Sequence, residues 1–132
     1  MQIENITFDE GKAKGSYTPA KKIDMGNSYL IFVSGIQHPE DANNNILAVA
    51  EQTHLVFQDI EKILNNAGAT LDNVVKAVIY LTDMKDFNVV SPIRKEYFKN
   101  SIPVSTLVEV NGMTKSGTKI EVEVTALLNK NT

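Results

Sequence analysis

The sequence predicts an α+β domain in which two helices pack on one face of a mixed β-sheet. Three observations support this prediction. Strand and helix patterns are interspersed along the chain, both helical patterns are amphipathic, and the last strand alternates apolar and polar residues. The chain has 132 residues, and its turns are rich in Gly and Asn without forming a linker. We therefore expect one domain over residues 1–132.

The first half of the chain predicts strands and one long helix. Weak strand patterns lie near residues 3–8 and 14–24, and the apolar run 29–34 is typical of a buried strand. A helix is expected next, with Asn45 as its N-cap and Gly68 just beyond its C-terminus. Its apolar or small residues recur at helical spacing: Ile46, Val49, Ala50, Thr53, Val56, Phe57, Ile60, Ile63, Leu64 and Ala67.

The second half predicts a strand, a helix and two further strands. Residues 74–81 are apolar on both faces of the expected strand, which indicates that both faces are covered. Ser91 as N-cap and Pro92 in the first turn predict a helix that ends near Asn100. Strands are expected over residues 104–110 and 119–128, and the second of these alternates cleanly.

The predicted helices leave the second face of the sheet without cover. The expected alternation places apolar side chains on that face: Val74, Val78, Tyr80, Leu107 and Leu127. An apolar sheet face is typical of an interaction surface, so we expect a homo-oligomer. A half-solvated antiparallel sheet with scattered apolar residues is the alternative interpretation.

Composition limits the classes of function. Thirteen basic and sixteen acidic side chains give a net charge of −3, and Arg94 is the single arginine, which disfavours binding to a nucleic-acid backbone. The absence of cysteine excludes disulfides, thiol catalysis and thiolate metal sites. The sequence contains neither a membrane-spanning apolar run nor a signal-peptide pattern, so we expect a cytoplasmic protein that does not bind membranes.

Few residues stand out as candidates for chemistry. His38 and His54 lack the clustered carboxylates that a metal site needs. Glu121 and Glu123 share one strand face, roughly 7 Å apart, which suits an acid–base pair; plain polar alternation is the alternative. Tyr17 in a loop, and Ser34 with Gly35 at a strand end, could meet a ligand or could be an ordinary packing aromatic and an ordinary turn.

Motifs in a fixed order connect the chain to a known family. The most specific is the block Leu-Thr-Asp-Met-Lys-Asp-Phe at residues 81–87. Further motifs lie at residues 15–20, 31–35, 51–53, 67–76, 96–98, 103, 108–110 and 119–123. Together they span residues 14–128 and resemble the Rid family, also called the YjgF/YER057c/UK114 or endoribonuclease L-PSP-like family.

The resemblance implies a chorismate-mutase-like fold and a homotrimer with clefts between subunits. It also implies hydrolysis of reactive imines and enamines, of the 2-aminoacrylate and 2-iminobutanoate class, to keto acids and ammonia without a cofactor or metal. Glu121 would orient the water. The residues implied to contact this small-molecule substrate are Tyr17, Ser34, Gly35, Phe87, Ser91, Ser105 and Leu107.

Two positions depart from the family pattern. Ser105 stands where the family has a substrate-gripping arginine, two residues after Pro103, and Ser91 replaces a common asparagine. A charge-assisted hydrogen bond contributes about 1.5–3 kcal/mol, so its loss could weaken substrate affinity about ten- to hundredfold. The chain therefore resembles an arginine-lacking subgroup, in which Ser105, Lys115 or Lys119 are candidates to hold an anion.

The departures leave three functions open. An imine deaminase with altered substrate anchoring is the first. The second is a non-catalytic trimer that binds a metabolite, which the missing arginine favours. The third is an endoribonuclease or translation inhibitor, a function assigned to several family members, which the acidic charge balance disfavours.

Overall fold

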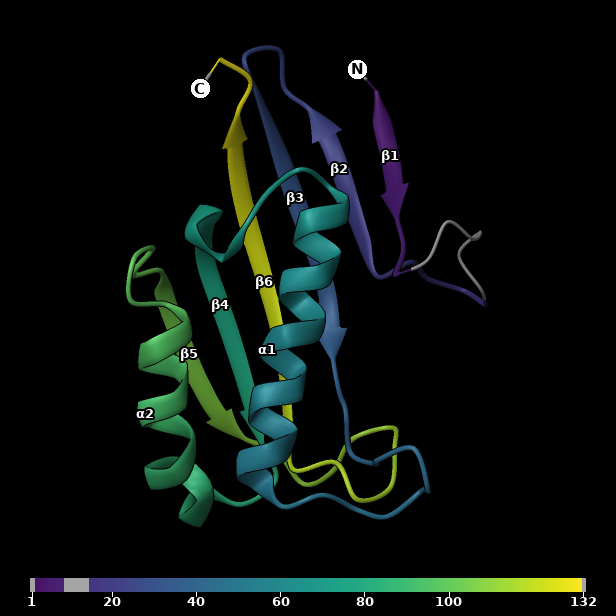
Figure 1. Ribbon diagram of the computed structural model, residues 1–132, viewed down its shortest axis with the longest axis vertical. Helices are drawn as coiled ribbons and strands as arrows, with labels where there is room; N and C mark the ends of the chain where they lie inside the picture. Colours follow the sequence, from purple (N-terminus) through teal and green to yellow (C-terminus); the bar gives the residue numbers. More distant parts are fainter. Residues whose placement is uncertain (1, 9–14, 132) are drawn as a thin grey trace.

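One six-stranded sheet, in the order β1-β2-β3-β6-β4-β5, forms the centre of the computed structural model (Figure 1). The structure describes residues 2–8 and 15–131. Only β4 and β5 pair in parallel; the other neighbours are antiparallel. The strands are β1 (Ile3–Ile6), β2 (Ala20–Asp24), β3 (Ser28–Ile36), β4 (Val74–Leu81), β5 (Val104–Glu109) and β6 (Ile120–Asn129).

Both α-helices lie on the same side of this sheet (Figure 1). They are α1 (Val49–Asn66), which packs on β3 and β6, and α2 (Phe87–Tyr97), beside α1. Two short 3₁₀ helices, η1 (Leu71–Asn73) and η2 (Met84–Asp86), lead into β4 and α2. This arrangement confirms the predicted α+β fold. None of the helices in the described part of the chain is long and apolar enough to cross a bilayer.

The hydrophobic core fills the layer between the sheet and the helices. Ile31 of β3, Ile79 of β4 and Val122 of β6 point into it and are fully buried. Phe57 of α1 stacks on Tyr97 of α2 at a centroid distance of 4.8 Å, which joins the two helices. The core is therefore one-sided, and the opposite sheet face has no layer of its own within the described part of the chain.

The helix α1 ends as predicted but begins later. Gly68 has a φ of 87°, and the N–H of Ala69 donates to the carbonyl of Leu64 at 2.8 Å, which is a Schellman ending. Asn45 is not the N-cap, so that prediction is wrong. The Asp41 carboxylate accepts the Asn45 N–H at 3.0 Å and holds the preceding residues in a turn.

The helix α2 begins at Phe87, five residues before the predicted first helical residue Pro92, so the prediction of Ser91 as N-cap is wrong. The Asp83 side chain accepts the Lys85 N–H at 2.9 Å and caps η2, which runs directly into α2. Pro92 lies inside the helix, where it removes one backbone hydrogen bond. Because η2 is capped at Asp83 and continues into α2, the helical segment begins well before Ser91.

The open sheet face differs from the prediction at two residues. A register shift between Val74 and Lys76 turns Val74 toward the core, where its exposure is 2%. Leu107 pairs with Ile79 and also packs against the core. Val78, Tyr80 and Leu127 remain on the open face, which Phe32, Val104 and Val108 extend.

A buried glutamine of α1 fixes the loop that leads into β6. Gln52 has no exposed surface, and its Nε2 donates to the carbonyls of Leu47 at 2.9 Å and Gly117 at 3.0 Å. Its Oε1 accepts the Lys119 N–H at 2.9 Å. The fully buried glutamine side chain thus pairs with three backbone groups of two loop segments. It also holds Lys119, which directly precedes the first residue of β6 and lies two residues before Glu121.

Replacing Gln52 with leucine is expected to lower the free energy of unfolding by about 2–5 kcal/mol. The reason is that each buried backbone group left without a partner costs about 1–3 kcal/mol. Chemical denaturation measures this loss. Gln58→Leu on the exposed side of α1 is the matched control and should change stability by less than about 0.5 kcal/mol. A loss below about 1 kcal/mol in Gln52→Leu would contradict this account of the loop.

Candidate functional site

The Glu121 carboxylate, near the start of β6, lies against the backbone of Gly35 in β3. A Cβ atom at Gly35 would lie 2.7 Å from Cδ of Glu121 and 3.1 Å from its Cγ, so no larger residue fits beside the carboxylate in this position. Glycine at this point of β3 therefore lets the carboxylate reach the backbone of the neighbouring strand. Glu121 itself is half-buried on the open face.

Gln37, just after β3, orients this carboxylate. Its Nε2 donates to Oε1 of Glu121 and also lies 3.3 Å from Oγ1 of Thr114. Its Oε1 accepts from the Thr118 hydroxyl at 3.1 Å. The amide is thus held at both ends, and its orientation toward the carboxylate is fixed.

The end of β3 also anchors the loop that carries Tyr17. The Ser34 hydroxyl donates to the Thr18 carbonyl at 2.8 Å, and the Ser34 N–H donates to the Pro19 carbonyl at 2.8 Å. Tyr17 itself is 69% exposed. Ser34, Gly35 and Glu121 therefore belong to one region, with Tyr17 on a loop bonded to it.

A second carboxylate and a tyrosine extend this region across the sheet. Tyr80 of β4 pairs with Glu121 in the strand register, and its hydroxyl donates to Oε1 of Glu123 at 2.5 Å. This hydrogen bond to Glu123 is the main cause that raises the pKa of Tyr80 above its ordinary value of 10.0, followed by burial and the negative charges of both glutamates. The phenol therefore stays neutral and can act as a donor throughout the physiological range.

The remaining predicted residues lie at the other edge of the domain. Phe87 begins α2 and is partly exposed, Ser91 lies one turn later, and Ser105 and Leu107 are on β5. Ser105 and Ser91 line a cavity of about 460 Å³ between α2 and β5. The strand β4 separates this edge from β6, so one chain does not bring Ser105 and Glu121 into contact.

The described residues offer little for a metal ion. Within residues 2–8 and 15–131, no group of three or more His, Asp or Glu side chains gathers at one place. His38 pairs with Asp59 alone, at 2.7 Å. Lys115, which the sequence suggested as a residue that could hold an anion, lines a separate surface cavity together with His38 and Gln37. The chemistry available at Glu121 is therefore that of carboxylates, an amide, hydroxyls and backbone groups.

Sequence reasoning missed Gln37 and Tyr80 as members of the site. Gln37 follows the Ser-Gly pair by two residues, but nothing in its spacing indicates that it faces β6. Tyr80 was expected on the open face, and only the strand register places it opposite Glu121. Pairing of antiparallel strands was the missing information in both cases.

Comparisons with known proteins show the family of the chain. The family model described as Endoribonuclease L-PSP matches residues 8–128. A RutC family protein of Buchnera aphidicola is 37% identical over 125 residues, which cover 91% of this chain and 93% of that protein. The human 2-iminobutanoate/2-iminopropanoate deaminase is 32% identical over 117 residues, with coverage of 87% and 82%.

Solved structures give the same result. Rv2704 of Mycobacterium tuberculosis, a member of the YjgF/YER057c/UK114 family, has a TM-score of 0.75 at 28% identity, covering 95% of this chain and 98% of that one. E. coli TdcF with bound serine has a TM-score of 0.75 at 25% identity, with coverage of 93% and 97%. The chain therefore belongs to the endoribonuclease L-PSP family, that is, the YjgF/YER057c/UK114 or Rid family.

Proposed function

We propose that this protein hydrolyses small reactive imines or enamines to keto acids and ammonia, with Glu121 as the residue that positions and deprotonates water. The observation that carries the proposal is the Glu121 carboxylate held between the Gly35 backbone and the Gln37 amide. A relative at 32% identity is named as a deaminase of 2-iminobutanoate and 2-iminopropanoate, which supports this substrate class.

The reaction that fits this site is the addition of water to the imine, followed by loss of ammonia. The water oxygen bonds to the imine carbon while the C=N electron pair moves to nitrogen. Glu121 accepts a proton from the water and returns it to the nitrogen. Glu121 then accepts the hydroxyl proton of the resulting carbinolamine and passes it to the amino nitrogen. The carbon–nitrogen bond breaks as the oxygen electron pair forms the carbonyl, and ammonia leaves. In this proposal Ser34, Gly35 and the Tyr17 loop contact the substrate beside the carboxylate, which their position next to Glu121 supports.

A trimer would complete the site in this proposal. Glu121 lies on β6, whereas Phe87, Ser91, Ser105 and Leu107 lie at the α2–β5 edge, so a second copy is needed to bring the two groups together. The open face supports assembly because it exposes apolar side chains: Phe32, Val104, Val108 and Leu127. We infer a homotrimer whose sheets face its centre and whose clefts lie between subunits.

Substrate anchoring is altered in this proposal. Ser105 provides a hydroxyl where a bidentate arginine would grip a carboxylate, which supports our assignment of the chain to an arginine-lacking subgroup. This departure favours a second candidate function, a trimer that binds a small metabolite without turnover. The E. coli TdcF structure contains bound serine, which shows that one similar protein holds a small amino acid.

Glu121→Gln is expected to lower imine hydrolysis at least a hundredfold, because general base catalysis contributes about 10²–10⁴-fold. Serine or threonine dehydratase generates the imine in the assay, and semicarbazide traps whatever is not hydrolysed. Wild-type protein should suppress trapping. Glu61→Gln, on the exposed side of α1, is the matched control and should suppress trapping like the wild type.

Two outcomes of this assay would contradict the deaminase proposal. Equal suppression by Glu121→Gln and wild type would remove Glu121 from the chemistry. No suppression by the wild type at high concentration would remove the activity and leave the metabolite-binding trimer as the better account.

Sedimentation equilibrium should give three times the chain mass of 14.6 kDa for the wild type. Phe32→Lys is expected to shift the mass toward one chain, because a charge on the open face cannot be buried without a partner. Met25→Lys, in the exposed β2–β3 turn, is the control and should keep the wild-type mass. A single-chain mass for the wild type would overturn the trimer.

A further inference from the structure

The cavity between α2 and β5 has a chemical character that the role of Glu121 does not explain. Its volume is about 460 Å³, within the usual range for small-molecule sites. Phe98 and Pro103 provide apolar surface, and Ser91 and Ser105 provide hydroxyl groups. Cationic side chains from the α2 end complete the lining, and no acidic residue belongs to it. The cavity therefore favours a small ligand with a negative charge.

Arg94 contributes a positive charge that the described residues do not neutralise. Its Nη1 lies 3.5 Å from Oγ of Ser105, which is a weak contact, and no carboxylate of residues 2–8 or 15–131 forms an ion pair with it. The side chain is half-buried, so its charge is partly shielded from water. Most of the guanidinium donors therefore remain available to an anion.

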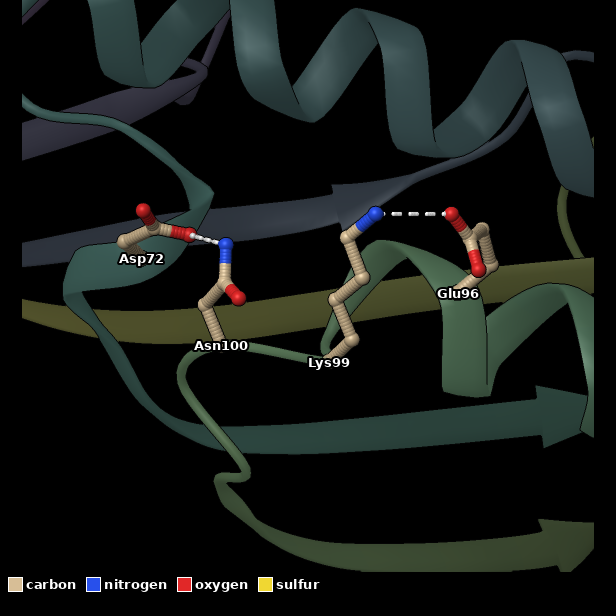
Figure 2. A network of polar contacts seen from close by, with 4 residues as sticks. All are labelled: Asp72, Glu96, Lys99 and Asn100. Atoms are coloured by element: carbon tan, nitrogen blue, oxygen red, sulfur yellow. Dashed lines mark hydrogen bonds and ion pairs between the residues drawn. The ribbon is translucent and has the colours of Figure 1, made fainter.

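Lys99, a further cation of the cavity lining, differs from Arg94 in this respect. Figure 2 shows Lys99 reaching Glu96, at 2.9 Å, one turn back on the same helix end. Its charge is therefore compensated within the chain. Asn100 contacts Asp72 at 3.3 Å, which ties the end of α2 to η1 (Figure 2). Of the other two cations in the lining, Arg94 and Lys95, neither forms an ion pair with a carboxylate of residues 2–8 or 15–131, and Arg94 offers the planar guanidinium fork.

The backbone at the mouth of the cavity is strained. Ile102 has a φ of 45°, which is rare for a β-branched residue, and its side chain is 79% exposed. Its N–H donates to the Phe98 carbonyl at 2.9 Å, which holds the turn. Strain of this kind clusters at ligand sites. Here the strained conformation keeps the apolar Ile102 side chain at the mouth of the cavity, next to the cationic residues of the lining.

We propose that this cavity binds the carboxylate of a small keto or imino acid, with Arg94 as the anchor. A guanidinium pairs with a carboxylate through two parallel hydrogen bonds, and the adjacent Ser91 and Ser105 hydroxyls can donate to the same group. The Phe98 and Ile102 side chains suit a short apolar chain. The substrate class rests on the proposed deaminase function, but anion binding at Arg94 does not require turnover.

In this proposal the cation is Arg94 of α2, which lies beside Ser105 of β5. Arg94 thus supplies the positive charge for anion binding that Ser105 alone lacks. Lys115 lines a different cavity, and neither Lys115 nor Lys119 is among the residues that line the cavity with Ser105. Arg94 is the residue that combines a free charge, a forked donor geometry and contact with Ser105.

Isothermal titration with 2-oxobutanoate tests the anchor without turnover. Wild-type protein should bind it, and the uncharged 2-oxobutanamide should bind at least tenfold more weakly. Arg94→Gln should weaken 2-oxobutanoate binding ten- to hundredfold and leave 2-oxobutanamide unchanged. Arg94→Lys, which keeps the charge and loses the fork, should fall between them. Lys62→Gln on α1 is the matched control and should bind like the wild type.

The results separate this anchor from the deaminase proposal. Keto-acid binding that survives Glu121→Gln and is lost in Arg94→Gln supports the anchor, whether or not the protein turns over imines. Wild-type affinity in both Arg94 variants overturns it and leaves the role of Glu121 intact. Absence of 2-oxobutanoate binding to wild-type protein at millimolar concentration also overturns it. An NMR titration with 2-oxobutanoate gives a further test: changes in amide chemical shift confined to residues outside 91–105 would overturn the anchor too.

Discussion

The approach of the Glu121 carboxylate to the Gly35 backbone is the constraint on which the candidate site depends. It requires a glycine in β3, an orienting amide from Gln37, and a β6 strand that begins at the right residue. The last requirement is met far from the open face, by the buried side chain of Gln52. One polar side chain in the core thus sets the position of a carboxylate on the opposite side of the sheet.

The one-sided core explains why function is expected at the open face and at the β5 edge. Both α-helices cover the same face, so the other presents apolar side chains beside the glutamates. Burial of that face by further copies would separate Glu121 and Glu123 from bulk solvent while leaving room for the reacting water, and a lower local dielectric strengthens electrostatic interactions there. Assembly and chemistry are therefore linked in this account, because the same surface serves both.

The sequence predicted the strands and both helices because their hydrophobic periods are clear, and it predicted the Gly68 helix end from the conformational freedom of glycine. It misplaced both helix starts because Asp41 and Asp83 form local hydrogen bonds that compete with the predicted caps. It misplaced Val74 because a bulge reverses the alternation, and no residue type marks that bulge.

The site was predictable in part. Resemblance supplied Glu121, Ser34 and Gly35, which the structure brings together, and it supplied Ser105, which lies at a different edge. Gln37 was not predicted because its contact with Glu121 crosses 84 positions of sequence. The sequence predicted that Arg94 lies on a helix, but its contact with Ser105 depends on how α2 packs on β5, which the sequence alone did not indicate.

Gly35→Ala provides the most direct test of the central claim, that Glu121 works from its place against Gly35. Imine hydrolysis by Gly35→Ala, Glu121→Gln and the double variant would be measured together. The account predicts a folded Gly35→Ala protein, because the added methyl group meets a flexible side chain, with activity as low as Glu121→Gln and no further loss in the double variant. Wild-type activity in Gly35→Ala, or losses that multiply in the double variant, would contradict it.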